Sequence, residues 1–308
     1  MVINTEDFKN NVRNERTKIF IKPYDFIYKE FEKLKFHTKN NQFFFDNASE
    51  IIDKLREMTW KDFQKQEEKF SSDMLLSLVE EEDLYGLSPF EAVTWFSQTF
   101  PTHIYQLNLS NTNSRRSRAG KEFEAIIELI LIGAGIPVDS QGNIATSSFA
   151  EKGLGKLVDV VSPGAVEYLL NKRNTVLVSA KTTLRERWQE VPEEMQRTGA
   201  REMFLITLDE TISENVINNL YESNIQIVTT YINKTTHYAE YSSVLDFESL
   251  LEILQDNAKR WETFEYDEES LEEKIKLTKI QLEHHKEHKF VVDYYAKALK
   301  KLKNLKDN

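Results

Sequence analysis

The segment 156–199 constrains the fold of this 308-residue chain more than any other. Apolar residues alternate over Lys156–Ser162, and Thr175–Lys181 is a second short apolar run that ends on a lysine. Both patterns are typical of strands. After them, Pro192 suits the first position of a helix that we expect over Glu193–Thr198, since proline is tolerated at a helix start. The segment therefore predicts two neighbouring strands followed by a helix.

A carboxylate interrupts the first of these strands at Asp159. Burying a carboxylate is costly unless a positive group pairs with it, and Lys181 at the end of the second strand can supply that group. Mg²⁺ prefers oxygen ligands such as one or two carboxylates together with substrate phosphate. A lysine beside them can position water and offset phosphate charge, so the pair predicts metal-dependent phosphodiester hydrolysis. The usual second acid, two residues before the lysine, is absent because Ser179 stands there.

The residues around this gap resemble a known family. The sequence SAKTTLRERW over Ser179–Trp188, followed by Glu194, is similar to the SsoII-like type II restriction endonucleases, relatives of PspGI and of the EcoRII catalytic domain. The resemblance extends to Ser114–Glu128 and is weaker at both ends of the chain. It implies the PD-(D/E)XK fold: α/β, with a central mixed sheet flanked by helices and with helical additions at the N- and C-terminal ends. It also implies that the second acid has moved to the following helix, where this chain has Glu194.

The same resemblance implies the chemistry of the site. Asp159 and Glu194 are expected to hold Mg²⁺, and Lys181 is expected to position the attacking water and to stabilise the charge on the phosphorus centre. Attack in line on phosphorus leaves 5′-phosphate and 3′-hydroxyl ends. The expected substrate is double-stranded DNA.

A further acid of the family falls on the helix before the first strand. The resemblance places it at Glu124, which is expected to support a water molecule at the metal or a second ion. The residues alone say less, because Glu124 lies at the border of an amphipathic helix expected over Lys121–Ile132, where glutamates are usually half-solvated. Glu122 and Glu128 are the alternatives on the same helix.

Base recognition is predicted for three charged residues that begin four positions after Lys181. Thr182 or Thr183 can cap a short helix starting at Leu184, and its first turn then carries a charged trio. Arginine pairs with guanine through two hydrogen bonds and glutamate accepts from cytosine, so this trio suits G·C pairs. A charged helix start is the alternative. In the family the matching residues read the CC:GG half-site, so we expect a CCNGG-like site cut before the first C. The trio consists of Arg185, Glu186 and Arg187.

The first hundred residues carry apolar residues at helical spacing, and Arg56 and Trp60 lie one turn apart in one of these expected helices. From the residues alone, core packing is the better interpretation of Trp60. The family implies another role, because its members extrude the central base of their site and stack it on a tryptophan. Trp60 matches that tryptophan, with Arg56 beside it.

A polar and basic stretch precedes the helix of Glu124. We expect His103–Leu109 to form a short strand and Asn111–Gly120 to form a loop. A solvated turn is the usual fate of such charge runs, while contact with DNA phosphate is the functional alternative. The candidate phosphate contacts are Arg115, Arg116, Arg118 and Lys121.

The charge and composition of the chain are compatible with this function. The net charge of −11 includes seven acids within Glu262–Glu273, whereas Ser114–Lys121 holds four basic residues and no acid. A nuclease needs only a local basic cleft. The absence of cysteine excludes disulfides and zinc–thiolate sites and fits a reducing cytoplasm. No signal peptide or membrane-length apolar run is recognised.

Three histidines near the C-terminus do not predict a metal site. They lack the glutamate of the H-E-x-x-H pattern and are flanked by lysines, so we expect a solvated helix face. The long helical stretch Leu271–Lys306 that contains them is expected to break near 284–289. The three residues are His284, His285 and His288.

The expected organisation has three parts. Residues 1–100 form a mostly helical subdomain for DNA contact, the base-flipping pocket and dimerisation; residues 101–245 form the nuclease core, and residues 246–308 form C-terminal helices. We interpret the chain as a homodimeric type II restriction endonuclease, since two-fold symmetry lets each subunit read one half-site. A cognate DNA methyltransferase is expected as a functional partner. The alternatives are a structure-specific repair or recombination nuclease of the same fold and an inactive DNA-binding protein.

Overall fold

The structure, a computed structural model, describes residues 4–144, 151–154 and 158–307, without the side chains of Asn143, Glu186, Arg187 and Asp307. Its contacts divide the chain into two compact units. The helical unit comprises Met1–Glu30 and Arg56–Glu122, and the sheet unit comprises Phe31–Leu55 and Phe123–Asn308. Two long helices contribute to both units. They are α3 (Asn41–Leu76) and α5 (Pro101–Ala134).

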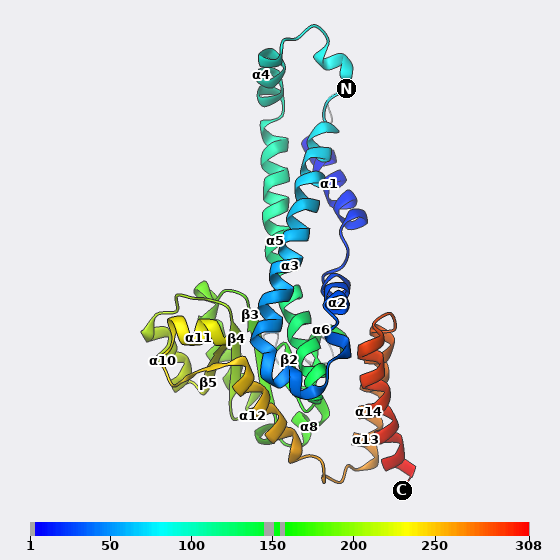
Figure 1. The fold of residues 1–308 in the computed structure, drawn as a ribbon, viewed down its shortest axis with the longest axis vertical. Coiled ribbons are helices and arrows are strands. Elements are labelled where there is room, and N and C mark those ends of the chain that lie inside the picture. The colour runs from blue at the N-terminus through cyan, green and yellow to red at the C-terminus, as the bar shows by residue number, and fades with distance from the viewer. Residues whose placement is uncertain (1–3, 145–150, 155–157, 308) are drawn as a thin grey trace. The chain divides into compact units, whose positions relative to one another are not determined.

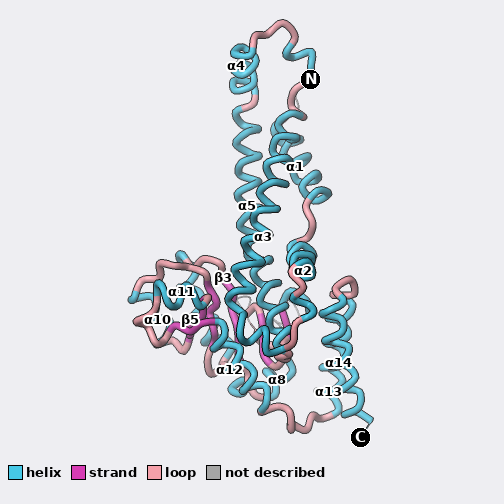
Figure 2. Tube along the Cα trace, in the orientation of Figure 1, coloured by secondary structure: helices cyan, strands magenta, loops and turns pink. Residues whose placement is uncertain are grey.

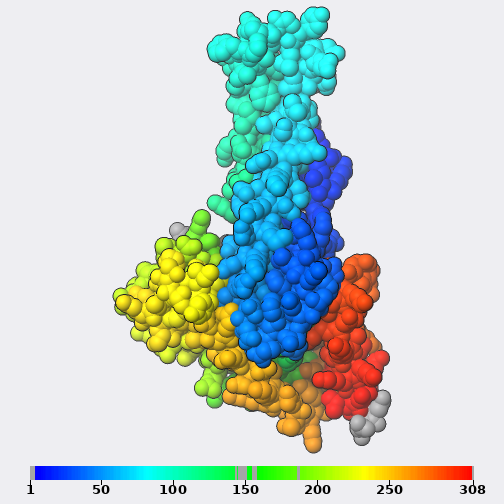
Figure 3. Space-filling model, viewed as in Figure 1, coloured from blue at the N-terminus to red at the C-terminus, as the bar shows by residue number. Residues whose placement is uncertain are grey.

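The described residues of the helical unit form helices and turns (Figure 2). Its core gathers aromatic side chains, with Phe8, Phe70 and Phe100 fully buried. Segment 77–88 and α4, cyan in Figure 3, instead expose large apolar side chains such as Tyr85. Besides its share of α3 and α5, the unit contains α1 (Thr5–Ile19), most of α2 (Pro23–Lys33), η2 (Glu81–Leu84) and α4 (Pro89–Thr99).

Helix α5 corrects two expectations. The predicted strand His103–Leu109 and the predicted loop Asn111–Gly120 are both wrong, because α5 runs through them without a break. The buried positions of this stretch follow helical spacing, at His103, Leu107 and then at two polar residues. The pattern of apolar residues could not reveal this buried face of the helix, because two of its buried positions are occupied by polar residues. These polar residues are Asn111 and Arg118.

The sheet unit is organised around a mixed six-stranded sheet whose spatial order follows the sequence (Figure 1). The first three strands pair antiparallel, and the third to sixth pair parallel. The predicted α/β fold with a mixed sheet and added helices is therefore confirmed. The strands are β1 (Asp139–Ser140), β2 (Val160–Ser162), β3 (Val176–Lys181), β4 (Met203–Thr207), β5 (Ile225–Thr229) and β6 (Val244–Asp246).

Helices pack on this sheet, and its middle strands β2, β3, β4 and β5 are almost entirely buried. Leu177, Leu205 and Ile227 share a core cluster with residues of α8, α9 and α10, while α12 contacts β2, β5 and β6. No helix in the described part of the chain combines the length and apolar character that a membrane span requires. The helices of the unit are η1 (Phe36–Thr38), α6 (Gln141–Ile144), α8 (Ala165–Leu170), η3 (Lys172–Asn174), η4 (Arg185–Gln189), α9 (Glu190–Thr198), α10 (Glu214–Glu222), α11 (Tyr231–His237), α12 (Phe247–Lys259), α13 (Glu268–His284) and α14 (Lys289–Asp307).

Several expected elements appear close to their predicted bounds. The strand-like runs Met203–Leu208 and Ile225–Tyr231, with a helix expected over Thr211–Ser223 between them, predict a β-α-β unit with parallel strands, and β4, α10 and β5 form it. The expected break of the C-terminal helical stretch separates α13 from α14, which pack against each other. The strand predicted over Lys156–Ser162 is shorter than expected, because β2 covers only Val160–Ser162, and all three of its residues are buried, so the predicted alternation of faces is not observed. Residues 155–157 lie outside the described part.

The predicted solvated histidine face is wrong for two of its three members. His285 is fully buried and His288 nearly so. The imidazole Nε2 of His285 lies 3.1 Å from Oε1 of the buried Glu128 on α5, and its Nδ1 lies 3.2 Å from Nδ1 of His288. A carboxylate contributed by a distant helix makes burial of these rings possible, and local sequence does not contain that information.

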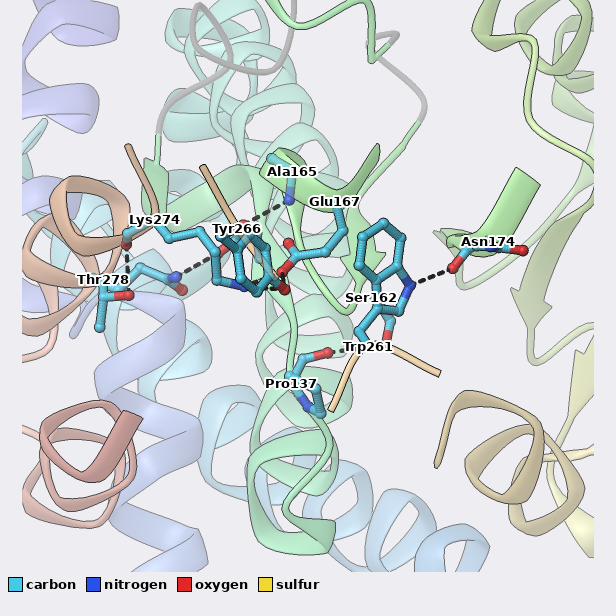
Figure 4. A network of polar contacts seen from close by, with 11 residues as sticks. Pro137, Ser162, Ala165, Glu167, Asn174, Trp261, Tyr266, Lys274 and Thr278 are labelled. Carbon is cyan, nitrogen blue, oxygen red and sulfur yellow. Dashed lines mark hydrogen bonds and ion pairs between the residues drawn. The ribbon is translucent and has the colours of Figure 1, made fainter. Parts of the chain in front are cut away.

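A buried polar network joins α13 to the sheet (Figure 4). Asp139 accepts hydrogen bonds of 2.7 Å from Ala165 N and from the side-chain amide of Gln281. Glu167 accepts a 2.5 Å hydrogen bond from the Tyr266 hydroxyl and forms an ion pair with Lys274. Burial raises the pKa of Asp139 to about 6, against hydrogen bonds that lower it. This network positions the C-terminal helices through partners that are far apart in the chain.

Candidate active site

Asp159 and Lys181 lie side by side at the antiparallel strands β2 and β3. Asp159 comes directly before β2 and Lys181 is the last residue of β3. Lys181 Nζ is 3.1 Å from Asp159 Oδ2, which also accepts a 2.6 Å hydrogen bond from Ala180 N. Asp159 N donates to Val178 O at 2.9 Å. The structure thus brings the two predicted residues together in a contact fixed by the backbone.

The environment of Asp159 favours a positive neighbour. Its side chain and that of Lys181 are each 11% exposed. Burial raises the pKa of the Asp159 carboxyl above its usual range, and the Lys181 ammonium lowers it in turn. Further positive charge beside the carboxylate would offset the remaining cost of desolvation.

The other two predicted acids lie on helices of the sheet unit. Glu194 is 6% exposed on α9, and its Oε2 is 3.9 Å from the mostly exposed Arg197. Helix α9 begins at Glu190, three residues before the predicted start, so Pro192 occupies its third position. Gly199 ends the helix in the left-handed conformation, with φ of 66°, as glycine allows. Glu124 is half-buried on α5.

The carboxylate oxygens of these acids are ligands that a hard divalent cation prefers. Among the described residues, no group of three or more histidine and acidic side chains is close enough to hold a metal ion. Asp159 and Glu194 nevertheless offer two carboxylates of low exposure. Mg²⁺ commonly binds one or two carboxylates and completes its shell with water and phosphate.

The segment after Lys181 is a turn whose form differs from the prediction. Leu184 is not helical; a 3₁₀ helix covers Arg185–Gln189 instead. Arg185 has a φ of 43°, a left-handed value that is uncommon for residues other than glycine. Its side chain is exposed. The side chains of the predicted readers Glu186 and Arg187 lie outside the described residues.

Asp209 contacts the segment after Lys181, and the sequence did not identify it. Its carboxylate accepts a hydrogen bond from Leu184 N, directly before Arg185. Asp209 follows β4, the strand that pairs with β3 in parallel, with Thr207 opposite Lys181. A polar residue at the same strand edge as the catalytic lysine was the available signal, but only the pairing register identifies that edge.

In the helical unit, Trp60 is 46% exposed, so the core-packing interpretation is wrong. Its ring stacks on Phe63, with centroids 6.0 Å apart and an angle of 27° between the planes. Arg56, one turn earlier in α3, is also exposed. A half-exposed indole supported by a buried phenylalanine is sterically able to receive a stacked base.

The four basic residues of α5 differ from one another in their surroundings. Arg116 and Lys121 are exposed. Arg115 is half-exposed and pairs with the buried carboxylate of Glu67. Arg118 is 9% exposed; its Nη1 donates to Ile21 O at 2.8 Å, and its guanidinium pairs with Glu122 and lies over the rings of two phenylalanines. Arg118 is therefore engaged inside the unit, and Arg116 and Lys121 are the accessible candidates for phosphate contact.

Comparisons with known proteins identify the family. The family described as EcoRII C terminal matches residues 96–251. The type II restriction enzyme SsoII of Shigella sonnei is 48% identical over 296 residues, which cover 96% of this chain and 97% of that enzyme.

Two solved structures agree. Metal-depleted Ecl18kI in complex with uncleaved DNA has a TM-score of 0.92 and 47% identity, covering 97% of this chain and all of that one. A complex of restriction endonuclease PspGI with substrate DNA shares the fold, with a TM-score of 0.57 and 15% identity over 78% of this chain and 94% of that one. The chain therefore belongs to the family of the EcoRII C-terminal domain and is a type II restriction endonuclease similar to SsoII.

Proposed function

We propose that this endonuclease cuts double-stranded DNA at a CCNGG-like site, before the first C, in a Mg²⁺-dependent reaction. The observation that carries the proposal is the Asp159–Lys181 pair, followed within four residues by the exposed Arg185. Chemistry and base reading are thus joined on one short segment. The DNA complexes solved for Ecl18kI and PspGI support duplex DNA as the substrate.

The residues of the chain divide the work at the phosphate. Asp159 and Glu194 would hold Mg²⁺, which supplies positive charge to the scissile phosphate when bound. Lys181, held 3.1 Å from Asp159, positions the attacking water and offsets the charge that develops on phosphorus. Glu124, on α5, supports a water molecule at the metal or a second ion. The water loses a proton to solvent as its oxygen forms a bond to phosphorus, the bond to O3′ breaks, and O3′ takes up a proton from solvent, which leaves 3′-hydroxyl and 5′-phosphate ends.

Base reading follows from the chemistry of the trio Arg185, Glu186 and Arg187. Two arginines and one glutamate match the acceptors of guanine and the donor of cytosine in the major groove. Arg185→Ala should weaken binding to the specific site by about 1–3 kcal/mol while salt-sensitive non-specific binding persists. Arg201, an exposed arginine after α9, is the matched control. Equal loss of both kinds of binding would indicate phosphate contact or misfolding.

The helical unit is assigned the remaining DNA contacts. Trp60, with Arg56 beside it, receives the extruded central base, and Arg116 and Lys121 contact phosphate. A palindromic site is matched by a homodimer, because each subunit then reads one half-site and cuts one strand. Along the sequence, residues 1–100 serve DNA contact, base flipping and dimerisation, residues 101–245 form the nuclease core, and residues 246–308 form the C-terminal helices. Expression in the cytoplasm requires a cognate methyltransferase that protects the host site.

Digestion of phage DNA with Mg²⁺, followed by sequencing of the cut ends, tests this function. We expect discrete fragments whose ends begin at CCNGG, and none when the metal is chelated. Asp159→Asn should bind the same duplex without cutting it. A smear of fragments would indicate a nuclease without sequence specificity, and intact DNA under all conditions would indicate an inactive DNA-binding protein.

A further inference from the structure

The backbone of the base-reading segment is held in a conformation that needs external support. Arg185 has φ of 43°, and residues with a side chain occupy this region only when their surroundings determine it. On its N-terminal side, Leu184 is buried in the core cluster of the sheet. Its N–H donates to the carboxylate of Asp209. The turn is therefore fixed immediately before Arg185 by one apolar and one polar contact.

Asp209 lies in the connection between β4 and α10, and two further hydrogen bonds hold its backbone. Its N–H donates to Thr207 Oγ1 at 3.3 Å, and its carbonyl accepts a 2.7 Å hydrogen bond from the Tyr238 hydroxyl. That hydroxyl in turn accepts from Ile212 N at 3.0 Å. Tyr238 is 2% exposed at the end of α11. A chain of contacts thus runs from buried Tyr238 through Asp209 to Leu184 N.

The strand register explains why these residues meet. Lys181 lies opposite Thr207 in the parallel pair of β3 and β4, so the chain leaves both strands at the same edge of the sheet (Figure 1). The acid that follows β4 can then reach the turn that follows β3. A carboxylate is well suited to this place, since charge-assisted hydrogen bonds to N–H groups are shorter and stronger than neutral ones.

We propose that Asp209 is a positioning residue for base recognition: its carboxylate holds Leu184 N–H and so fixes the backbone that presents Arg185 to the DNA. The proposal rests on the proposed role of Arg185 in reading bases. Asp209 does not touch the substrate. Its contribution is to keep a strained turn in one conformation before DNA arrives, which lowers the cost of ordering it on binding.

The variants follow from the contacts. Asp209→Ala removes the acceptor, while Asp209→Asn retains a side-chain oxygen at the same position. Tyr238→Phe keeps the buried ring and removes only the hydroxyl that holds Asp209. The matched control is Asp246→Ala, since Asp246 accepts a comparable backbone hydrogen bond from Ser249 N at the start of α12 in the same unit.

The first measurement is the ratio of binding constants for the specific duplex and for a duplex with one G·C pair of the site replaced, without Mg²⁺. A single changed base pair typically alters affinity by about 5- to 150-fold. Asp209→Ala should reduce this ratio roughly tenfold and leave non-specific binding unchanged. Asp209→Asn should recover most of the ratio, and Tyr238→Phe should lose part of it. Asp246→Ala should lower Tm and leave the ratio unchanged.

The second measurement needs no DNA. Amide hydrogen exchange of Leu184 should become faster in Asp209→Ala and in Tyr238→Phe, while amides of β4 stay protected. Unchanged exchange at Leu184, or a ratio that falls no further in Asp209→Ala than in Asp246→Ala, would overturn the proposal. If the wild-type protein shows no preference among the duplexes, the role assigned to Arg185 fails instead, and the exchange result still decides whether Asp209 holds the turn.

Discussion

Asp159 in the sheet unit and Trp60 in the helical unit are the two residues on which the proposed reaction depends most, and their surroundings are opposite. The carboxylate is 11% exposed and contacts both backbone and Lys181. The indole is 46% exposed and rests on Phe63. A group that takes part in bond cleavage must be held within a fraction of an ångström, whereas a group that receives a flipped base must be accessible beforehand.

The difference extends to how each unit tolerates change. Substitutions at the buried site should remove cleavage and spare DNA binding, whereas substitutions on the exposed helix faces should alter DNA contacts and spare folding. Among the residues of the helical unit that the sequence predicts to contact DNA, Arg118 is the exception. It is 9% exposed and interacts with Glu122 and with Ile21 O. The following experiments test where this division holds.

The largest effect is expected for Glu194→Ala. If Glu194 supplies the acid that the strand lacks at Ser179, cleavage should fall by at least about 10³-fold, or about 4 kcal/mol in activation free energy, while DNA binding persists. Glu193→Ala is the matched control, because Glu193 lies on the same helix and its side chain is 77% exposed. Single-turnover cleavage rates check both variants. Activity near wild type in Glu194→Ala would move the metal-binding role to Glu193 or Glu190.

Arg118→Ala tests the exception. Removing this guanidinium leaves the largely buried Glu122 without its ion pair; burial already raises the pKa of Glu122, and Arg118 opposes that shift. We expect a loss of about 2–3 kcal/mol in the free energy of unfolding, below the value for a fully buried pair because some water reaches the site. Urea denaturation measures it. Lys121→Ala, on the exposed face, should unfold like wild type; a similar loss there would contradict the distinction.

Trp60→Ala should fold normally and lose its DNA platform. Stacking of a base on an aromatic ring contributes about 1–3 kcal/mol. With 2-aminopurine at the central position, fluorescence should rise when the base leaves the duplex and be quenched by the indole in wild type, so the variant complex should be brighter. Trp95, partly buried against the core of the same unit, is the control whose truncation should lower Tm and leave the fluorescence unchanged. Identical fluorescence in wild type and Trp60→Ala would remove the base-stacking role.

The smallest effect concerns a buried acid outside the active site. Burial raises the pKa of Asp139 from 3.8 to about 6, so the folded protein binds the proton of this carboxyl more tightly than the unfolded chain does, and protonation stabilises the fold. That contribution is complete below the ordinary pKa and is lost as pH rises through about 6. Asp139→Asn should therefore gain stability relative to wild type, by about 2 kcal/mol, between pH 4 and pH 7. Asp256→Asn, at an exposed residue of α12, should show no such difference. A constant difference across this range would show that Asp139 does not titrate there.

Sequence patterns predicted β3, β4 and β5 of the sheet well because these strands are short, apolar runs. β3, the β4–α10–β5 unit and the end of α9 at Gly199 all follow from local rules. They failed in α5, where the buried stripe includes Asn111 and Arg118. They failed again at His285 and His288, whose burial depends on Glu128 of another helix. In both cases polar residues are buried by partners far away in the chain.

The sequence by itself determined the fold class, the family, and the placement of Asp159 and Lys181 at two adjacent strands, Asp159 directly before one and Lys181 at the end of the other, because these depend on residue type and spacing along one segment. Only the tertiary structure decided which charged residues remain accessible. It engaged Arg118 in the helical unit, exposed Trp60, and brought Asp209 to Leu184 N. The physical reason is that exposure and partnership depend on which elements meet in space, and parallel strand register joins residues that no local pattern connects.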